Sequence, residues 1–217
     1  MNPEQIDQLL SQQAPFVFDR MFGAMEKVRE RLDRACSALT KANVPYAIVG
    51  GNAVAAWVAT RDDGAVRSTK DVDILLAPES SEAATEALAQ VGLAPGDGPR
   101  GCPSSDHCRD IVMDVTVFLD GPEGKPSQGL HVIWAGQKVR DDYVVAAPKT
   151  SQSRDIDGKQ IVDLVELLRM KLVSNRRKDQ VHVLDLIAVG LIDESWLPKL
   201  EPSLAQRLKV LLDDPDG

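Results

Sequence analysis

Two aspartates alternate with apolar residues in the short segment DVDILL, at positions 71–76. Because the side chains of a strand point to its two faces in turn, Asp71 and Asp73 share one face, and Val72 and Ile74 share the other. The apolar face predicts a place in a core, whereas two neighbouring carboxylates repel each other. The segment therefore predicts a β-strand with one face in the core and the other at a polar site.

A divalent cation would remove the repulsion between the two carboxylates. Mg²⁺ prefers carboxylate oxygens at about 2.0–2.1 Å and keeps coordination positions open for water and substrate phosphates. Such a pair on its own is also typical of a solvated surface, so the neighbouring sequence decides between the two interpretations.

Gly50 and Gly51 follow the apolar run YAIV at positions 46–49 and precede a predicted helix at 52–59. Glycine lets the backbone approach a ligand closely. The N-terminus of a helix offers unpaired N–H groups and the positive end of the helix dipole, which suit a phosphate. Asn52 lies near the cap of this helix. A tight strand-to-helix turn without any ligand is the alternative interpretation.

Predicted strands alternate with predicted helices through the middle of the chain, and helices alone follow. We expect helices over 1–44, 52–59, 80–91, 161–173, 179–189 and 202–212, and strands over 46–49, 72–76, 111–119, 131–134 and 143–146. Asp157-Gly158 is a turn signal, after which the composition becomes helical. This order predicts an α+β fold: a small mixed β-sheet with flanking helices and a helical C-terminal lobe. We divide it into N-terminal helices (1–44), a core (45–150) and the lobe (151–217).

The segment YAIVGGNAVAAWVATRDDGAVRSTKDVDILL, at positions 46–76, resembles the nucleotidyltransferase superfamily of the polymerase-beta type. That family has a glycine followed by Gly or Ser, a helix, and then an acidic pair between apolar residues. The lead-in RSTK, at 67–70, is similar to minimal nucleotidyltransferases that include toxins of toxin–antitoxin and abortive-infection systems. Many members have a serine near the phosphates where this chain has Gly51, so a side-chain contact there must come from Asn52 or be absent.

The resemblance implies a Mg²⁺- or Mn²⁺-dependent transfer of a nucleotide from an NTP to an acceptor hydroxyl or phosphate. It also implies that Asp71 and Asp73 bind the metal with a third carboxylate from a neighbouring strand. Asp114 fits, because an unpaired charge inside its apolar run would be costly; its face of the strand also carries Thr116 and Phe118. Asp110, at the start of the run, is the competing candidate.

The segments LLRMK (167–171) and RRKDQVHVLDL (176–186) resemble the helical region of the toxin-like enzymes. There a lysine and an aspartate from consecutive helices face the nucleotide, and Lys171 and Asp185 match them. Asp185 is expected to orient Lys171 or groups near the base. A surface lysine, or one that snorkels past the core, is the alternative for Lys171. Asp179, His182 and Asp185 could also form a structural hydrogen-bond cluster.

Charge supports an anionic ligand in this region. Positions 165–180 contain five Lys or Arg and two acidic residues, a balance of +3, whereas the whole chain carries -8. We therefore expect the catalytic and metal-binding residues to be Asp71, Asp73 and Asp114. The expected nucleotide-binding residues are Gly50, Gly51, Asn52, Arg67, Lys171 and Asp185. A catalytically silent binding or regulatory module of the same fold is the alternative, and a complete acidic triad argues against it.

The acceptor stays open between an RNA end, a protein and a small molecule, and an antitoxin protein is a possible partner. No apolar run reaches the roughly 18 residues of a membrane helix. The start of the chain does not resemble a secretion signal and the three cysteines are an odd number, so we expect a cytoplasmic protein with reduced thiols. Two motifs are rejected: the G-x-G-x-x-G at 96–101 does not follow a strand, and Cys102, His107 and Cys108 are too few for a structural zinc site.

Overall fold

The computed structural model describes residues 2–5, 17–96, 115–121, 124–125 and 129–215. Strands of these residues form one sheet, made of β1 (Tyr46–Val49), β2 (Val72–Leu76), β3 (Leu93–Pro95), β4 (Val115–Asp120), β5 (Leu130–Trp134), β6 (Ser153–Ile156) and β7 (Lys159–Val162). The helices around it are α2 (Val17–Lys41), α3 (Gly50–Ala59), α4 (Ser81–Ala89), α5 (Leu164–Ser174), α6 (Arg177–Ala188) and α7 (Pro202–Asp213).

The sheet is mixed, and its strands follow the order β3-β4-β5-β2-β1-β7-β6. β1 and β2 are antiparallel with Val49 opposite Asp73, whereas β2 and β5 are parallel with Asp73 opposite His131. β4 is antiparallel to β5 and places Val117 opposite His131. Because paired residues share a face of the sheet, these four residues form one row across it.

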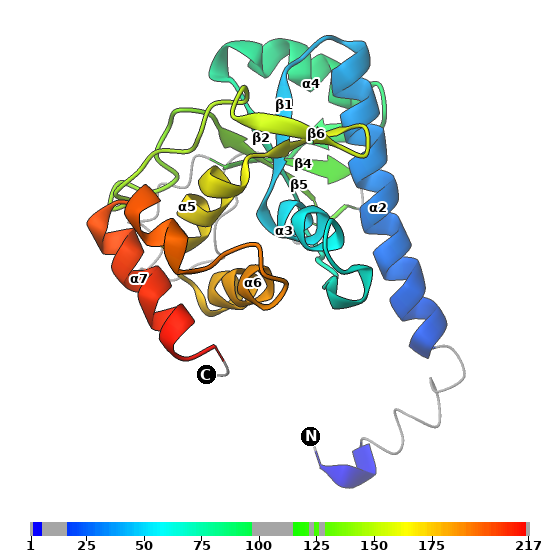
Figure 1. The fold of residues 1–217 in the computed structure, drawn as a ribbon. Coiled ribbons are helices and arrows are strands. Elements are labelled where there is room, and N and C mark those ends of the chain that lie inside the picture. Colours follow the sequence, from blue (N-terminus) through cyan, green and yellow to red (C-terminus); the bar gives the residue numbers. More distant parts are fainter. Residues whose placement is uncertain (1, 6–16, 97–114, 122–123, 126–128, 216–217) are drawn as a thin grey trace.

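The other face of the central strands belongs to the core. α2 lies against this side, since its Arg31 and Arg34 form ion pairs with Asp120, which shares the face of Phe118 on β4. In Figure 1, α2 runs along the right of the sheet and α4 lies above it. The residues buried on this side of the central strands include Val72, Ile74, Phe118, Leu130 and Val132.

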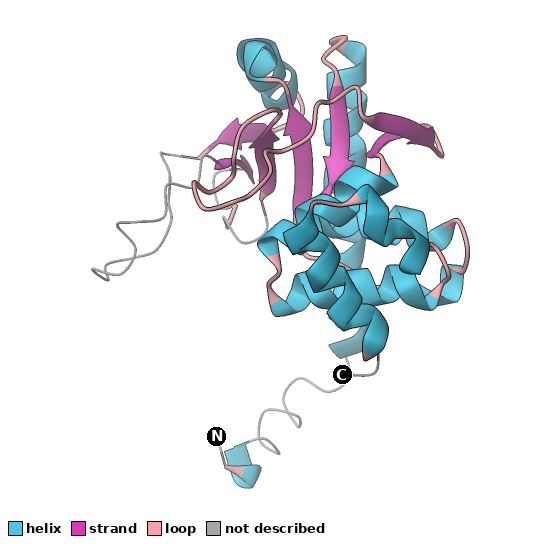
Figure 2. Ribbon diagram, turned by 60° about the vertical axis from the view of Figure 1, so that its left-hand side comes forward, coloured by secondary structure: helices cyan, strands magenta, loops and turns pink. Residues whose placement is uncertain are grey.

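The remaining helices, α3 and α5 to α7, gather below the sheet in Figure 1 and at one end of its strands in Figure 2. α3 begins directly after β1 and contacts β2, α5 and α6. Trp57 of α3 donates a hydrogen bond from Nε1 to the backbone oxygen of Val162 on β7, at 3.0 Å. Because β1 and β2 are antiparallel, the end of β1 and the start of β2 meet beside these helices.

The predicted α+β class is confirmed by this mixed sheet and its flanking helices. The strands expected at 46–49, 72–76 and 131–134 are present, and β4 covers the second half of the strand expected at 111–119, whose start lies outside the described residues. The helices expected at 52–59, 80–91, 179–189 and 202–212 are present with shifted ends. None of the helices in the described part of the chain is long and apolar enough to cross a bilayer.

Three predictions were wrong. The G-x-G-x-x-G stretch at 96–101 was expected not to follow a strand, yet β3 ends at Pro95, directly before it. Residues 143–146 form a connection without strand structure. The helix expected from 161 begins only at Leu164, because β6 and β7 form a hairpin around Asp157-Gly158. The φ angles of these two residues are +52° and +74°. Two consecutive positive φ angles are typical of the two-residue hairpin turn that Asp-Gly favours, so the pair connects two strands.

Several sequence features lie wholly or largely outside the described residues. They are the G-x-G-x-x-G stretch beyond Gly96, the trio Cys102, His107 and Cys108, and the two acidic candidates Asp110 and Asp114. Cys36, on α2, is described: it is a free thiol and is buried in the core. Burial raises the pKa of this thiol to about 11, which keeps it protonated at neutral pH.

Candidate functional site

Gly50 lies directly against the carboxylate of Asp73. Its φ is +67°, a left-handed conformation that side chains disfavour, and a Cβ at this position would overlap Asp73. At Gly51 a Cβ would come within 2.9 Å of Oγ1 of Thr69. Only glycine therefore lets the backbone at the start of α3 approach the strand that carries the acidic pair.

Asn52 ties α3 to the start of β2. Its Nδ2 donates a hydrogen bond to the backbone oxygen of Asp71, at 2.8 Å. Oγ1 of Thr69 lies 3.4 Å from the backbone nitrogen of Asp71 and reinforces the same turn. The structure thus brings Gly50, Gly51 and Asn52 together with both aspartates at one end of the sheet. Thr69, which sequence reasoning missed, belongs to this turn.

His131 is a neighbour of Asp73 that sequence reasoning also missed. Its Nδ1 lies 3.2 Å from Oδ1 of Asp73, and the two side chains are 22% and 24% exposed. His131 stands in the short strand expected at 131–134, with no motif around it. Its role becomes visible only through the pairing of β2 with β5, which a single sequence does not reveal.

The third carboxylate, whether Asp114 or Asp110, stays a prediction because both lie outside the described residues. Thr116 and Phe118 are described, and they pair with Val132 and Leu130 on the side away from Asp73. Within the described ranges, no three His, Cys, Asp or Glu side chains are grouped so that they could hold a metal ion.

Lys171, Arg176 and Asp179 form an ion cluster around the buried Asp179, called here the α5–α6 cluster; the side chain of Arg176 is 60% exposed. Nζ of Lys171 lies 3.2 Å from Oδ1 of Asp179, and Nε of Arg176 donates to Oδ2 at 2.7 Å. Lys171 is 7% exposed and Asp179 is 1% exposed. Lys171 is thus a buried, paired lysine, and neither a surface lysine nor one that snorkels to water. Its partner is Asp179, whereas the sequence suggested Asp185.

The α5–α6 cluster lies within electrostatic reach of Asp73. Burial lowers the pKa of Lys171, and the negative charges of Asp179 and Asp73 partly offset this effect. Burial also opposes the charge of Arg176, but its bond to Asp179 and the charges of Asp179 and Asp73 raise its pKa. Burial alone would raise the pKa of Asp179, yet the hydrogen bond from Arg176 and the charge of Lys171 lower it. The charge of Asp73 therefore acts on both cations of the cluster.

Arg67 and Asp185, both predicted to bind nucleotide, bind each other. Nε of Arg67 donates to Oδ1 of Asp185 at 2.7 Å, and their side chains are 65% and 11% exposed. The pair joins the connection before β2 to α6. In the structure Asp185 therefore positions Arg67 rather than Lys171.

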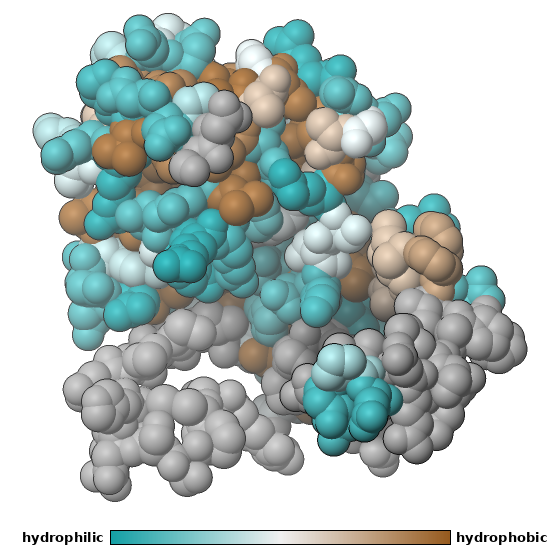
Figure 3. Space-filling model, turned by 90° about the horizontal axis from the view of Figure 1, so that it is seen from below, coloured by the Kyte–Doolittle hydropathy of each residue, from teal (hydrophilic) through white to brown (hydrophobic). Residues whose placement is uncertain are grey.

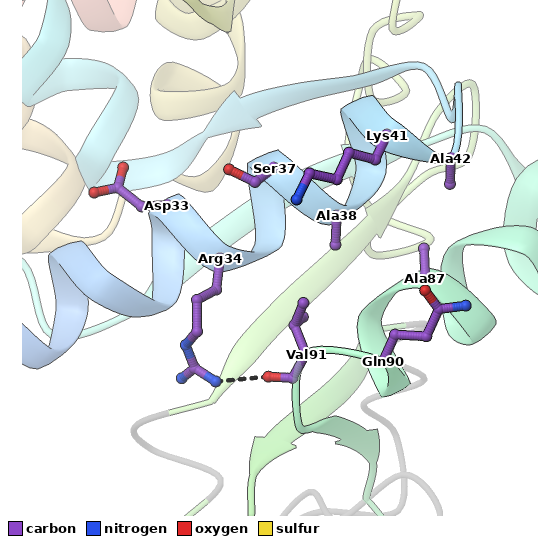
Figure 4. Close-up of a pocket in the computed structure, with 9 residues that line it drawn as sticks. All are labelled: Asp33, Arg34, Ser37, Ala38, Lys41, Ala42, Ala87, Gln90 and Val91. Atoms are coloured by element: carbon purple, nitrogen blue, oxygen red, sulfur yellow. Dashed lines mark hydrogen bonds between the residues drawn. The ribbon is translucent and has the colours of Figure 1, made fainter.

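A pocket of about 670 Å³ opens elsewhere, between α2 and α4, and is drawn in Figure 4. Arg34 lines it and donates from a terminal guanidinium nitrogen to the backbone oxygen of Val91, at 2.7 Å. Asp33 and Lys41 line it as well, together with small and apolar side chains. None of the predicted site residues contributes to it, so its volume says nothing about the Asp71–Asp73 region.

No protein-family model and no curated protein matches this chain. Among solved structures, the antibiotic-resistance factor ANT(2'')-Ia is similar, with 12% identity over 85% of this chain and 88% of its own, and a TM-score of 0.49. JHP933 from Helicobacter pylori is 17% identical over 88% of this chain and 75% of its own, with a TM-score of 0.49. A candidate nucleotidyltransferase from H. pylori is 19% identical over 87% and 76%, with a TM-score of 0.46.

Proposed function

We propose that this chain is a metal-dependent nucleotidyltransferase, which moves a nucleotide from an NTP to an acceptor hydroxyl. The contact between Gly50 and Asp73 carries the proposal. It sets the N-terminus of α3, where a phosphate is favoured, directly beside a carboxylate. Phosphate and carboxylate repel each other, so an arrangement that favours both calls for a cation between them.

The available donors fit Mg²⁺ or Mn²⁺. Asp71 and Asp73 supply hard carboxylate oxygens, and the side chain of Asp73 is partly exposed. Mg²⁺ is commonly bound by one or two carboxylates together with substrate phosphates and water, a number that Asp71 and Asp73 supply. The resemblance names Asp114 as the third ligand. Thr116 and Phe118, which follow it at alternate positions, lie on the side of the sheet away from Asp73, so Asp71 and Asp73 alone carry the proposal. When bound, the cation would neutralise charge on the triphosphate and align it for attack.

The protein's own groups bind and orient the nucleotide. Lys171 and Arg176 carry two positive charges against the one negative charge of Asp179, which leaves +1, and the charge of Asp73 acts on both cations. We assign Lys171 to a phosphate contact, and the backbone of Gly50 and Gly51 to the phosphate approach at the start of α3. Asn52 fixes the start of β2 through its hydrogen bond to Asp71. Arg67 fixes the connection before β2 through its ion pair with Asp185 on α6. Nucleotide transfer depends mostly on such positioning and charge neutralisation.

Asp114 would assist the attacking hydroxyl of the acceptor. The attacking and leaving oxygens stand roughly in line across the reacting phosphorus, so the acceptor enters opposite the departing pyrophosphate. An RNA end, a protein hydroxyl and a small molecule all provide the oxygen that this geometry needs.

The test is to incubate the protein with each labelled NTP and Mg²⁺. Separate reactions contain total RNA, cell lysate or a panel of aminoglycosides as the acceptor. The native chain should label one acceptor class, and Asp73→Asn should abolish the labelling. Asp63→Asn is the matched control, because this carboxylate is exposed on the same connection before β2. Full activity of Asp73→Asn would refute the mechanism. A native chain that binds no NTP and labels nothing would favour the silent module.

The toxin role implied by the sequence resemblance has its own test. Controlled expression in a bacterial host should arrest growth for the native chain and permit growth for Asp73→Asn. Normal growth with an active enzyme would remove the toxin role and leave the transfer reaction intact. Growth arrest by both chains would separate any toxicity from the proposed chemistry.

A further inference from the structure

The apolar stripe of α2 begins before the helix reaches the rest of the fold. Phe18, Met21, Phe22 and Met25 are 70%, 48%, 61% and 44% exposed. Residues 17–28, called here the α2 extension, therefore present an apolar surface to solvent. In Figure 1 this end of α2 projects below the sheet, and Figure 3 shows a hydrophobic patch on the right of a mostly hydrophilic face.

The exposed stripe is continuous with a buried one. Farther along α2, Val28 and Leu32 pack partly against the core, and Ala35 and Leu39 are fully buried. The apolar positions from 18 to 39 are Phe18, Met21, Met25, Val28, Leu32, Ala35 and Leu39, with spacings that alternate three and four. This is the heptad pattern of a helix that packs against another element along its whole length. In this fold only the second half of α2 packs against the rest of the protein.

The α2 extension gains little stability from packing, because its apolar side chains face water, and most helical stability in proteins comes from the packing of an apolar face. Gly23 lies in its middle, where glycine costs about 1 kcal/mol relative to alanine, and nothing lies within 4 Å of the position of its absent Cβ. A second element against the stripe would remove both the exposure and the fraying.

We propose that two copies of this chain pair through the α2 extension as an antiparallel coiled coil. The heptad supports a register in which Phe18 of one copy lies opposite Val28 of the other, and Met21 lies opposite Met25. The two-fold axis repeats both pairs, which gives four layers of apolar contacts. Phe22, beside the stripe, adds apolar contact across the same axis. The proposal does not depend on the transfer reaction.

The antiparallel direction follows from the shape of the protein. In α2 the stripe is free up to about Val28, and beyond it the chain's own core occupies the same face. A parallel partner would bring its core alongside the first copy's core. An antiparallel partner places the two cores at opposite ends of the paired segment, where they do not compete for space.

The surface is large enough for a dimer of modest strength. Each phenylalanine can bury about 150–250 Å². From their exposed fractions, Phe18 and Phe22 of two copies together would remove roughly 400–650 Å² from water. The two methionines and the flanking polar side chains add to this area, which approaches the lower end of about 1,200–2,000 Å² found for specific interfaces. We expect a monomer–dimer equilibrium that shifts with concentration.

Sedimentation velocity over a concentration series tests the association. The native chain should sediment as a dimer at high concentration, and Phe18→Glu with Phe22→Glu should raise the dissociation constant by about 100-fold or more. Val210→Glu is the matched control, since Val210 is 63% exposed on α7 and should leave the constant unchanged. A native chain that stays monomeric would overturn the proposal, as would equal effects of the two changes. Monomers with a protected α2 extension would instead point to the chain's own first residues as the cover.

Cysteine pairing tests the direction. Under mild oxidation, a mixture of Met21→Cys and Met25→Cys chains should form a mixed covalent dimer in higher yield than either variant alone. The native chain, with its three cysteines, is the blank. Preferential cross-linking of each variant with itself would indicate a parallel pair and contradict the proposed register.

Discussion

Two aspartates of this protein each bind two cationic side chains, on different elements. Asp179 does so in the α5–α6 cluster. Asp120 of β4 does so with Arg31 and Arg34 of α2, a group called here the α2–β4 cluster. Both clusters contain two positive charges and one negative charge. Their composition alone would assign them the same role.

The surroundings distinguish them. In the α2–β4 cluster Arg34 also binds the backbone oxygen of Val91, and Asp120 is 31% exposed, so the cluster fastens a helix to a strand. In the α5–α6 cluster Asp179 is 1% exposed, and a second carboxylate, Asp73, acts on both cations. A surplus of positive charge near an additional acidic group is what a site for a metal-bound phosphate needs. The residues around a charged cluster therefore indicate its role better than the charged residues that form it.

The largest expected effect comes from Asp179→Ala. It leaves the buried Lys171 without its partner, and breaking such a pair costs about 3–5 kcal/mol in the free energy of unfolding. Asp120→Ala should cost less, because Asp120 is itself 31% exposed, although its partner Arg31 is as buried as Lys171. Urea unfolding of both variants at neutral pH measures the difference. Equal losses would mean that the two clusters do not differ in burial as described.

Lys171→Met should separate the clusters by function. A charge-assisted contact to phosphate is worth about 1.5–3 kcal/mol, so nucleotide affinity should fall roughly 10- to 150-fold. The free energy of unfolding should change little, because methionine suits the buried position and Asp179 keeps Arg176. Arg34→Met is the matched change in the α2–β4 cluster and should leave affinity unchanged. Calorimetric titration with NTP and Mg²⁺ measures the affinity of each protein. Equal dissociation constants for the native chain and Lys171→Met would make Lys171 purely structural.

Much of this fold can be predicted from the sequence, because the local pattern of polar and apolar residues matches their burial in the structure. DVDILL alternates between polar and apolar positions, and β2 has Asp73 on one face and the buried Val72 and Ile74 on the other. The hairpin β6–β7 shows the opposite case. Its turn, Asp157-Gly158, is a strong hairpin signal, but its strands have only four residues each and merge in sequence with the helical pattern of α5.

The site was less predictable, since its contacts depend on pairing across the chain. Asp179 was grouped by helical spacing with His182 and Asp185, yet its partners are Lys171 on α5 and Arg176 before α6. Helical spacing identifies which residues share a face, but not which neighbouring element that face meets. The link between His131 and Asp73 needs the register of two strands more than fifty residues apart.

Acid titration should sharpen the comparison through Asp120. Burial would raise the pKa of Asp120, but Arg34 and Arg31 hold it below its ordinary value. A carboxyl whose pKa is lower in the folded state stabilises the fold above its unfolded pKa of about 3.9, and this contribution is lost as the pH falls through the folded pKa. The stability gap between the native chain and Asp120→Asn should thus be constant from about pH 7 to 5 and shrink below about pH 4. Urea unfolding across this range measures the gap, and a gap that widens in acid would contradict the assignment.

The smallest expected effect belongs to Arg67→Gln, which breaks the ion pair that joins the connection before β2 to α6. Arg67 is 65% exposed, so water replaces most of what Asp185 provides, and exposed pairs are worth about 0.2–1 kcal/mol. The melting temperature should hardly change. If the pair only holds the wall of the site, nucleotide affinity should fall by at most about fivefold, far less than for Lys171→Met. Asp185→Asn should act in the same direction and by a similar factor, because either change removes the same contact. A loss as large as that of Lys171→Met would show that Arg67 touches the nucleotide itself, and the positive charge of the site would then extend beyond the α5–α6 cluster.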